Sequence, residues 1–103
     1  MGLRTGRYVY FIRDGLGHIK IGVTNNVKNR IKELQTANPM KLEYFYGMHV
    51  KTSEDAYNLE EELHKKFSNI RLMGEWFKEE EVLEFLKQPK IYTSKYMFDG
   101  VSW

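Results

Sequence analysis

The sequence predicts an α+β domain, a small three-stranded sheet flanked by helices with its elements in the order β-β-α-β-α-α. Three observations predict this fold class. Two short β-branched and aromatic segments lie on either side of a glycine-containing turn, which is typical of a hairpin. Three later segments repeat their apolar residues at helical spacing, and a third aromatic segment separates the first two of them. Such helices bury their apolar faces on the sheet in one shared core.

The hairpin comes first along the chain. Residues 7–12 read RYVYFI, a β-branched and aromatic run that favours a strand. In the turn over residues 13–17, Gly15 and Gly17 are free to take positive φ. Residues 18–23 then alternate polar and apolar side chains, which predicts a half-buried strand that closes the hairpin.

A helix and a third strand follow. The Thr-Asn-Asn run at 24–26 offers several N-caps, and a helix is predicted over residues 27–36 with its apolar stripe on Val27, Ile31 and Leu34. Pro39 prevents the helix from continuing. The aromatic-rich residues 42–50 predict the third strand.

Two more helices complete the order. Thr52 precedes an acidic first turn and opens a helix that is predicted to run to about Phe67. A shorter helix is predicted over residues 78–87. The apolar stripe of the first consists of Ala56, Leu59, Leu63 and Phe67, and that of the second of Val82, Leu83, Phe85 and Leu86.

Composition narrows the class of protein. A length of 103 residues suits one domain, and 42% hydrophobic residues are enough for a core. Cysteine is absent, which excludes disulfides, thiolate zinc sites and cysteine nucleophiles. No apolar run is long enough for a membrane span, and the first residues lack the apolar core of a secretory signal. We therefore expect a cytoplasmic protein with no membrane partner.

Charge is distributed unevenly along the chain. Residues 1–41 carry eight Lys and Arg against two acidic residues, a net charge of +6, whereas residues 42–103 carry eight against twelve, a net charge of −4. A basic half beside an acidic half suits a polyanion bound on one side and a cation on the other. The alternative is ordinary surface charge that clusters by accident.

Tyr10 and Lys20 form the first candidate pair. Alternation along the two predicted strands places them on one face of the hairpin. A turn centred near Gly15 would set them roughly opposite each other, and an ammonium beside a phenol favours its charged form, which lowers the pKa. Tyr10 would then serve as a base or a water-orienting group. The alternative is a packed tyrosine beside a solvated lysine.

Arg30 is the second candidate. It lies three residues after Val27 and four before Leu34, at the edge of the apolar stripe. An arginine there either extends along the apolar surface toward water or points its planar fork at phosphate oxygens.

Glu60 and His64 form the third candidate group, on the longer helix. Glu60 falls four residues after Ala56 and three before Leu63, so it leans toward the core side. A carboxylate in that position is costly unless it is paired or binds a metal. Magnesium takes oxygen ligands, and one protein carboxylate suffices when phosphate supplies another oxygen. His64 lies one turn further on and either packs in the core or joins the site.

Taken together, these segments resemble a GIY-YIG endonuclease domain over about residues 7–88. YVY at 8–10 stands where the family has GIY, and KIG at 20–22 stands where it has YIG. GVTNNVKNR at 22–30 matches the stretch that ends in the family's arginine, and Leu59-Glu60 matches the helix with the metal-binding glutamate. Leu63-His64 and GEWF at 74–77 are similar to the small phage and bacterial subgroup labelled T5orf172 or Mug113-like.

The resemblance implies a role for each candidate residue. Tyr10 would orient or deprotonate the attacking water with help from Lys20, Arg30 would stabilise the phosphate, and His64 would support the site. Glu60 would bind one Mg²⁺ or Mn²⁺. Further contacts with the substrate are expected from five residues in or beside the motifs, namely Tyr8, Gly22, Thr24, Asn26 and Lys28.

Two residues depart from the family's pattern. Tyr8 replaces the glycine of GIY, which alters packing more than chemistry. Lys20 replaces the tyrosine of YIG, and this leaves the identity of the general base open. In GEWF, Trp76 and Phe77 are expected to cap the core, whereas the sequence does not decide whether Glu75 supports the site.

The sequence therefore predicts a metal-dependent endonuclease that hydrolyses phosphodiester bonds, in DNA, by water attack at a one-metal site. One alternative is a module on the same fold that binds nucleic acid without cutting it. Another is an interaction protein whose docking surface is the aromatic tail, residues 89–103, with Tyr92, Tyr96, Phe98 and Trp103. Because 103 residues leave no room for a separate DNA-binding domain beside the nuclease-like domain at 7–88, we expect either loosely specific cleavage or cleavage directed by a specificity partner, a homodimer or the tail.

Overall fold

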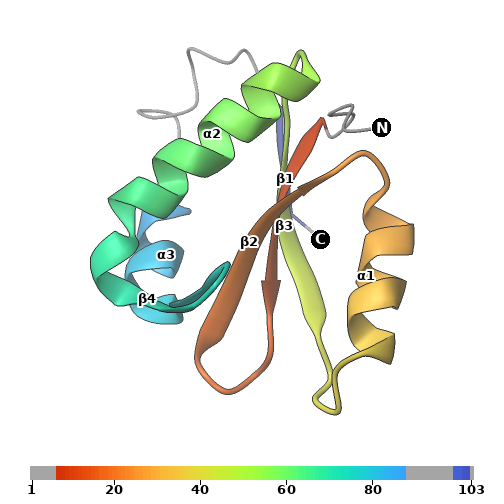
Figure 1. The fold of residues 1–103 in the computed structure, drawn as a ribbon, viewed down its shortest axis with the longest axis vertical. Helices are drawn as coiled ribbons and strands as arrows, with labels where there is room; N and C mark the ends of the chain where they lie inside the picture. Colours follow the sequence, from red (N-terminus) through yellow and green to blue (C-terminus); the bar gives the residue numbers. More distant parts are fainter. Residues whose placement is uncertain (1–6, 88–98, 103) are drawn as a thin grey trace.

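The computed structural model describes residues 7–87 and 99–102, which form an α+β fold (Figure 1). This confirms the predicted class and the predicted position of each of the six expected elements. The elements along the chain are β1 (Tyr8–Arg13), β2 (His18–Thr24), α1 (Val27–Thr36), β3 (Glu43–His49), α2 (Ser53–Lys66), the 3₁₀ turn η1 (Ser68–Ile70), β4 (Arg71–Met73), β5 (Trp76–Lys78), α3 (Glu79–Phe85) and β6 (Asp99–Ser102).

The sheet is larger than the three strands that the sequence predicts. It has six strands among the described residues, in the order β4-β5-β2-β1-β3-β6, and every neighbouring pair is antiparallel. The expected strands form its centre. β4 and β5 escape sequence-based prediction because each has three residues, too few to reveal a period of two. They are joined through Gly74, whose φ of +54° suits a residue without a Cβ.

Both faces of the sheet are covered by helices, as Figure 1 shows, with α1 on one side and α2 and α3 on the other. Adjacent residues of β1 therefore enter different clusters. Val9 and Phe11 pack with the apolar residues of α2 and α3, whereas Tyr10 and Ile12 pack with the smaller cluster beneath α1. All four side chains are buried, which explains why the β1 segment reads as an unbroken apolar run.

The helices bury their stripes to different extents. All four predicted residues of the α2 stripe are buried, and so are Val82 and Phe85 on α3. α1 buries none of its residues, and Ile31 and Leu34 pack only partly against the smaller cluster. α1 is therefore a thin cover over its face of the sheet, and most of the core lies beneath α2 and α3.

Local signals in the sequence account for the turns and the helix starts. Gly15 and Gly17 take positive φ of +79° and +93°, as the turn requires. Asn26 caps α1 by accepting a hydrogen bond from the Asn29 amide at 3.0 Å. Thr52 caps α2 in the same way, at 3.0 Å from the Asp55 amide.

Part of the predicted tail belongs to the sheet. Backbone pairing joins β6 to β3, with Val101 opposite Gly47. Tyr92, Tyr96, Phe98 and Trp103 lie outside the described residues. None of the helices in the described part of the chain combines the length and the apolar character that a membrane crossing requires.

Candidate active site

The candidate site lies where one edge of β2 stops pairing with β5. The ladder between these strands covers residues 18–20 of β2 and ends with Lys20 opposite Trp76. The next residue, Ile21, donates its amide hydrogen to the Glu75 carbonyl at 3.0 Å. Its own carbonyl accepts a hydrogen bond from Nε2 of His64 at 3.0 Å. The loop before β5 and the helix α2 therefore meet at one point of the strand edge.

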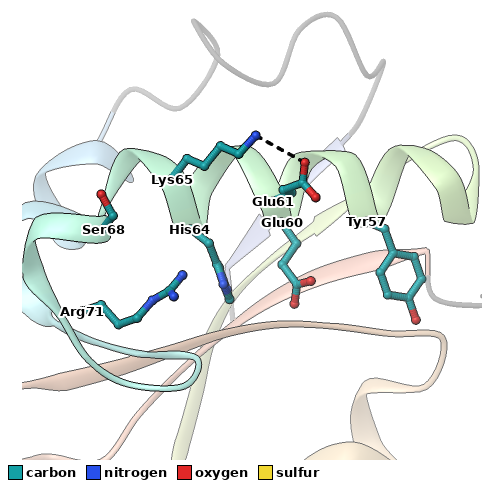
Figure 2. A pocket seen from close by; sticks show the side chains of 7 residues that line it. All are labelled: Tyr57, Glu60, Glu61, His64, Lys65, Ser68 and Arg71. Carbon is teal, nitrogen blue, oxygen red and sulfur yellow. Dashed lines mark ion pairs between the residues drawn. The ribbon is translucent and has the colours of Figure 1, made fainter.

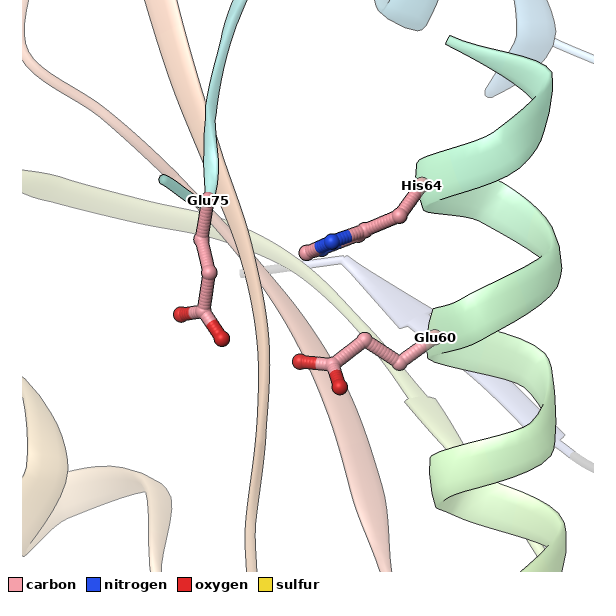
Figure 3. A group of neighbouring side chains, drawn as sticks. All are labelled: Glu60, His64 and Glu75. Atoms are coloured by element: carbon pink, nitrogen blue, oxygen red, sulfur yellow. The ribbon is translucent and has the colours of Figure 1, made fainter. Parts of the chain in front are cut away.

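Three side chains of types that can ligate a metal converge at this point. One ligand atom from each of Glu60, His64 and Glu75 lies within 4.8 Å of the other two. Glu60 and His64 project from successive turns of α2, and Glu75 approaches them from the other side of β2 (Figure 3). All three are half-buried. Two carboxylates and one imidazole from two elements form a donor set that suits a divalent cation.

The hydrogen bond of His64 sets its tautomer. A carbonyl oxygen only accepts, so Nε2 of His64 carries the hydrogen that Ile21 receives. The lone pair of Nδ1 is then left for a ligand or a water, an arrangement typical of metal-binding histidines. The ring also packs edge-on against Phe77 at a centroid distance of 5.0 Å. His64 therefore combines the packing role and the site geometry that the sequence presents as alternatives.

Glu75 is tied to Lys20. Oε1 of Glu75 lies 3.0 Å from Nζ of Lys20, whose side chain is only 12% exposed. The ammonium also lies 5.8 Å from the centre of the Trp76 ring. These two contacts hold a cation beside the three potential ligands.

The predicted pairing of Tyr10 with Lys20 is wrong in register. Tyr10 lies opposite Gly22, and Lys20 lies opposite Ile12. Arg13 pairs with Ile19, so the hairpin is centred at residue 16. The prediction from the sequence placed the centre at Gly15. A shift of one residue in the centre moves the cross-strand partner by two. The two side chains still share a face of the sheet, as expected.

The predicted lowering of the Tyr10 pKa is also wrong. Tyr10 is 1% exposed, and burial raises the pKa of its phenol above the usual value. The cation that opposes this effect is Arg30, whose Nε donates a hydrogen bond to the phenol oxygen at 3.4 Å. The nearby charges of Glu75 and Glu60 raise the pKa further. Tyr10 therefore keeps its proton at neutral pH.

Arg30 is held on α1 by contacts with Tyr10 and Glu33. Its Nη1 lies 3.4 Å from Oε1 of Glu33, one turn further along α1, and its side chain is 39% exposed. The contact with the Tyr10 phenol raises the pKa of the guanidinium, which stays charged. The sequence allows a guanidinium that extends along apolar surface or one that is directed at a polar partner, and the contact with Tyr10 agrees with the second.

The structure gives most of the predicted substrate-binding residues local roles. Tyr8 stacks on His49 with ring centroids 4.6 Å apart. The Thr24 hydroxyl accepts a hydrogen bond from the Asn26 amide at 3.1 Å, and the Asn26 side chain caps α1. Gly22 makes room for the Tyr10 phenol. Lys28 is exposed on α1. A direct contact of these five residues with substrate stays a prediction.

A pocket of about 590 Å³ runs along α2 and contains two of the three potential ligands, Glu60 and His64. In Figure 2, Tyr57, Glu60 and His64 project from the helix toward the strands, and Arg71 approaches from the next segment. Glu61 and Lys65 also line the pocket and form an exposed ion pair of 3.5 Å. The remaining lining residue is Ser68.

The positions of two residues at the site, Glu75 and Arg71, could not be predicted from the sequence. Glu75 lies in the GEWF segment, whose aromatic residues signal packing and give no hint that the acid turns toward Glu60. Arg71 begins a three-residue strand with no periodic signal. The only sequence signal for either is their position around the Gly74 turn, which returns the chain to β2.

These features define the chain as a small α+β domain with a group of side chains able to hold a metal ion beside the ammonium of Lys20. A family model described as the T5orf172 domain matches residues 7–89, and the chain belongs to this family. The domain is related to nuclease-associated modules of the GIY-YIG and HNH-like kinds. Comparison with curated proteins and with solved structures gives no match.

Proposed function

We propose that the chain is a metal-dependent endonuclease of the GIY-YIG type that hydrolyses phosphodiester bonds in DNA by water attack at a one-metal site. The observation that carries the proposal is the convergence of Glu60, His64 and Glu75 at the edge of β2. Lys20 forms an ion pair with Glu75 of this group. The charges of Glu75 and Glu60 raise the pKa of Tyr10, which therefore lies close enough to interact with them. Hydrolysis of a phosphodiester needs this combination of a metal site and fixed cations.

The donor set fits a hard divalent cation. Ligand atoms around Mg²⁺ or Mn²⁺ lie about 2 Å from the metal, so atoms that begin within 4.8 Å of one another need only a small closure. Glu60 is the principal ligand in this proposal, with a second oxygen from Glu75 and support from Nδ1 of His64. A cation bound here would lower the pKa of a bound water and neutralise negative charge on the phosphate.

The charged side chains of Arg30 and Lys20 have separate roles in this proposal. Arg30 stays charged at any relevant pH and presents a planar fork, so it stabilises the oxygens of the phosphate as their charge grows. Lys20 already holds Glu75 at 3.0 Å and offers its remaining hydrogens to a phosphate oxygen. Both side chains are fixed before substrate arrives, which avoids reorganisation during the reaction.

Tyr10 acts as a hydrogen-bond donor in this proposal. Its oxygen accepts a hydrogen bond from Arg30, so its own hydrogen is left to point at a water or a phosphate oxygen. Because burial raises its pKa, the phenol positions the water better than it deprotonates it.

The raised pKa of Tyr10 favours one alternative. A phenol that stays neutral and a lysine in place of the family's second tyrosine leave neither of these two motif positions with a base. A module that binds nucleic acid on the same fold without cutting it needs no base, and the fixed cations would still hold phosphate.

Conversion of supercoiled plasmid to nicked or linear DNA tests the proposal. Purified protein is incubated with Mg²⁺ or Mn²⁺ beside an EDTA control, Glu60→Gln and the matched variant Glu61→Gln. Glu61 is the neighbouring acid, but its side chain is 72% exposed, its carboxylate pairs with Lys65, and it is not one of the three potential ligands. We expect cleavage by the wild type and by Glu61→Gln, and none with EDTA or Glu60→Gln.

Other outcomes separate the alternatives. Cleavage that survives Glu60→Gln would contradict the assigned metal ligand. Plasmid that is shifted in a gel but never cut would favour the binding module. Direct titration of Mn²⁺, followed by its paramagnetic resonance signal, adds a readout independent of activity, and Glu60→Gln should weaken binding where Glu61→Gln does not.

A further inference from the structure

We propose that the pocket along α2 binds one strand of the nucleic acid, and that Arg71 holds the phosphate next to the one placed at Glu60 and His64. This inference rests on the proposed function, because it extends the same site. It assigns to Arg71 and Tyr57 a part in substrate binding that neither their sequence positions nor the family motifs indicate.

The length of the pocket exceeds what one phosphate needs. Its lining residues on this side extend from Tyr57 to Ser68, and eleven residues at the helical rise of 1.5 Å span about 16 Å. Successive nucleotides of a stacked strand rise by about 3.4 Å each. Glu60 and His64 lie between the two ends, so room remains on both sides of the proposed metal site for the flanking nucleotides.

Arg71 is suited to bind a phosphate at one end. It begins β4 and is exposed, and its guanidinium lies 5.5 Å from the centre of the Phe77 ring. Figure 2 shows the guanidinium directed toward His64. Within residues 7–87 no carboxylate forms an ion pair with Arg71, although Glu60 and Glu61 line the same pocket. A planar guanidinium that lies over an aromatic ring and is directed into the pocket is suited to bind a phosphate.

Tyr57 supplies a different kind of surface at the other end. Its half-buried ring projects from α2 on the same side as Glu60 (Figure 2). Strand-binding sites combine cations that follow the backbone with aromatic rings on which bases stack. The pocket offers both along one line, with the metal-ligating side chains between them.

The salt dependence of binding provides a direct test of Arg71. A fluorescein-labelled single-stranded DNA of twelve nucleotides is titrated with protein in EDTA, so that metal-dependent cleavage does not interfere. Each phosphate neutralised by a cation contributes about 0.7 to the slope of log K against log salt for a single strand. Arg71→Ala should therefore reduce the slope by about 0.7 and weaken binding about tenfold.

Arg13→Ala is the matched control. The Arg13 side chain is 41% exposed and also lies 5.5 Å from the centre of an aromatic ring, that of Phe45, but it pairs with Glu43 at 3.0 Å and lies outside the pocket. Its removal changes net charge equally and should leave the slope unchanged. Tyr57→Phe should bind like the wild type, whereas Tyr57→Ala should lose about tenfold in affinity.

Failure of this inference is distinguishable from failure of the proposed function. An unchanged slope for Arg71→Ala, or the same reduction in Arg13→Ala, overturns the inference even when the wild type cuts plasmid. A reduced slope in Arg71→Ala alone supports it even when no plasmid is cut. A wild type that binds no oligonucleotide and cuts no plasmid overturns both.

Discussion

The phenol of Tyr10 occupies the space that a side chain on Gly22 would need. The two residues lie opposite each other in the β1–β2 ladder. A Cβ built on Gly22 would lie 2.9 Å from Cε2 of Tyr10 and closer still to Cζ and the oxygen. The ring is 1% exposed and packs in the small cluster with Ile12 and Leu42 beneath α1. The glycine of the second motif therefore fixes where the tyrosine of the first motif points.

Gly22→Ala should destabilise the fold by about 1–3 kcal/mol, because it forces the buried phenol out of its position. Urea denaturation at pH 7.5 measures the free energy of unfolding. The same substitution in a Tyr10→Leu background should cost less, because the closest atoms are gone. Equal costs in the two backgrounds would show that the contact between the residues does not set the penalty.

Three tyrosines, one buried and two half-buried, predict a loss of stability at high pH. Burial raises the pKa of Tyr10, Tyr44 and Tyr46 above the ordinary value of 10.0. Above about pH 10 the unfolded chain releases these protons while the folded chain keeps them, so the free energy of unfolding falls as pH rises. Each such proton contributes up to about 1.4 kcal/mol per pH unit.

Tyr10→Phe isolates one of these protons. We expect its stability curve to fall less steeply than that of the wild type between pH 9.5 and 11, while the two differ by a constant between pH 7 and 8.5. Urea denaturation across this range measures both curves. Parallel curves above pH 10 would mean that Tyr10 titrates alike in both states, and the raised pKa would be wrong.

Much of the fold is predictable from this sequence because its signals are local. The caps Asn26 and Thr52, the turn glycines and the stripe of α2 each act within a few residues, and the predicted elements match the observed ones closely. The register of the hairpin was not predictable to the same accuracy. Gly15 and Gly17 both take positive φ, so the glycines alone do not decide whether the turn is centred at residue 15 or at residue 16. A centre at residue 15 pairs Tyr10 with Lys20, whereas the observed centre at residue 16 pairs Tyr10 with Gly22.

The candidate site is predictable in part for a related reason. Glu60 and His64 lie on one predicted helix, so spacing alone places them together. Glu75 reaches them only because β5 pairs with β2 and ends at Lys20 opposite Trp76, a contact between segments more than fifty residues apart in sequence. No local pattern contains that information. The pKa of Tyr10 likewise depends on burial beneath α1, which the alternation of a hairpin does not reveal.

Asn26 provides a test of a predicted substrate contact against a structural role. Its side chain caps α1, so Asn26→Ala should reduce stability by about 1 kcal/mol. Asn26→Ser keeps a capping oxygen and should restore most of that loss. Urea denaturation gives both values. If oligonucleotide binding falls equally in both variants while only the alanine is destabilised, Asn26 contacts substrate in addition to capping the helix.

The Lys20–Glu75 ion pair leads to a prediction in which two measured quantities change in opposite directions. Removing Lys20 takes a cation away from the potential ligands Glu60, His64 and Glu75, and it releases the Glu75 carboxylate from its partner at 3.0 Å. Lys20→Gln should therefore bind Mn²⁺ more tightly than the wild type, because a positive charge near the site disfavours a second one. It should nevertheless cut DNA more slowly, because a cation that neutralises phosphate is lost.

Glu75→Gln should instead weaken Mn²⁺ binding, by about 10- to 100-fold, the usual cost of losing a residue that supports a metal site. The resonance signal of free Mn²⁺ measures affinity for both variants without requiring activity, and the plasmid assay measures cleavage. Lys78→Gln is a suitable control, because Lys78 is an exposed lysine two residues beyond Trp76, opposite His18 and at the far end of the β5 ladder from Lys20. If Lys20→Gln and Glu75→Gln both weaken Mn²⁺ binding to the same extent, the ion pair serves to hold the Gly74 turn in place, and Lys20 has no separate effect on the metal.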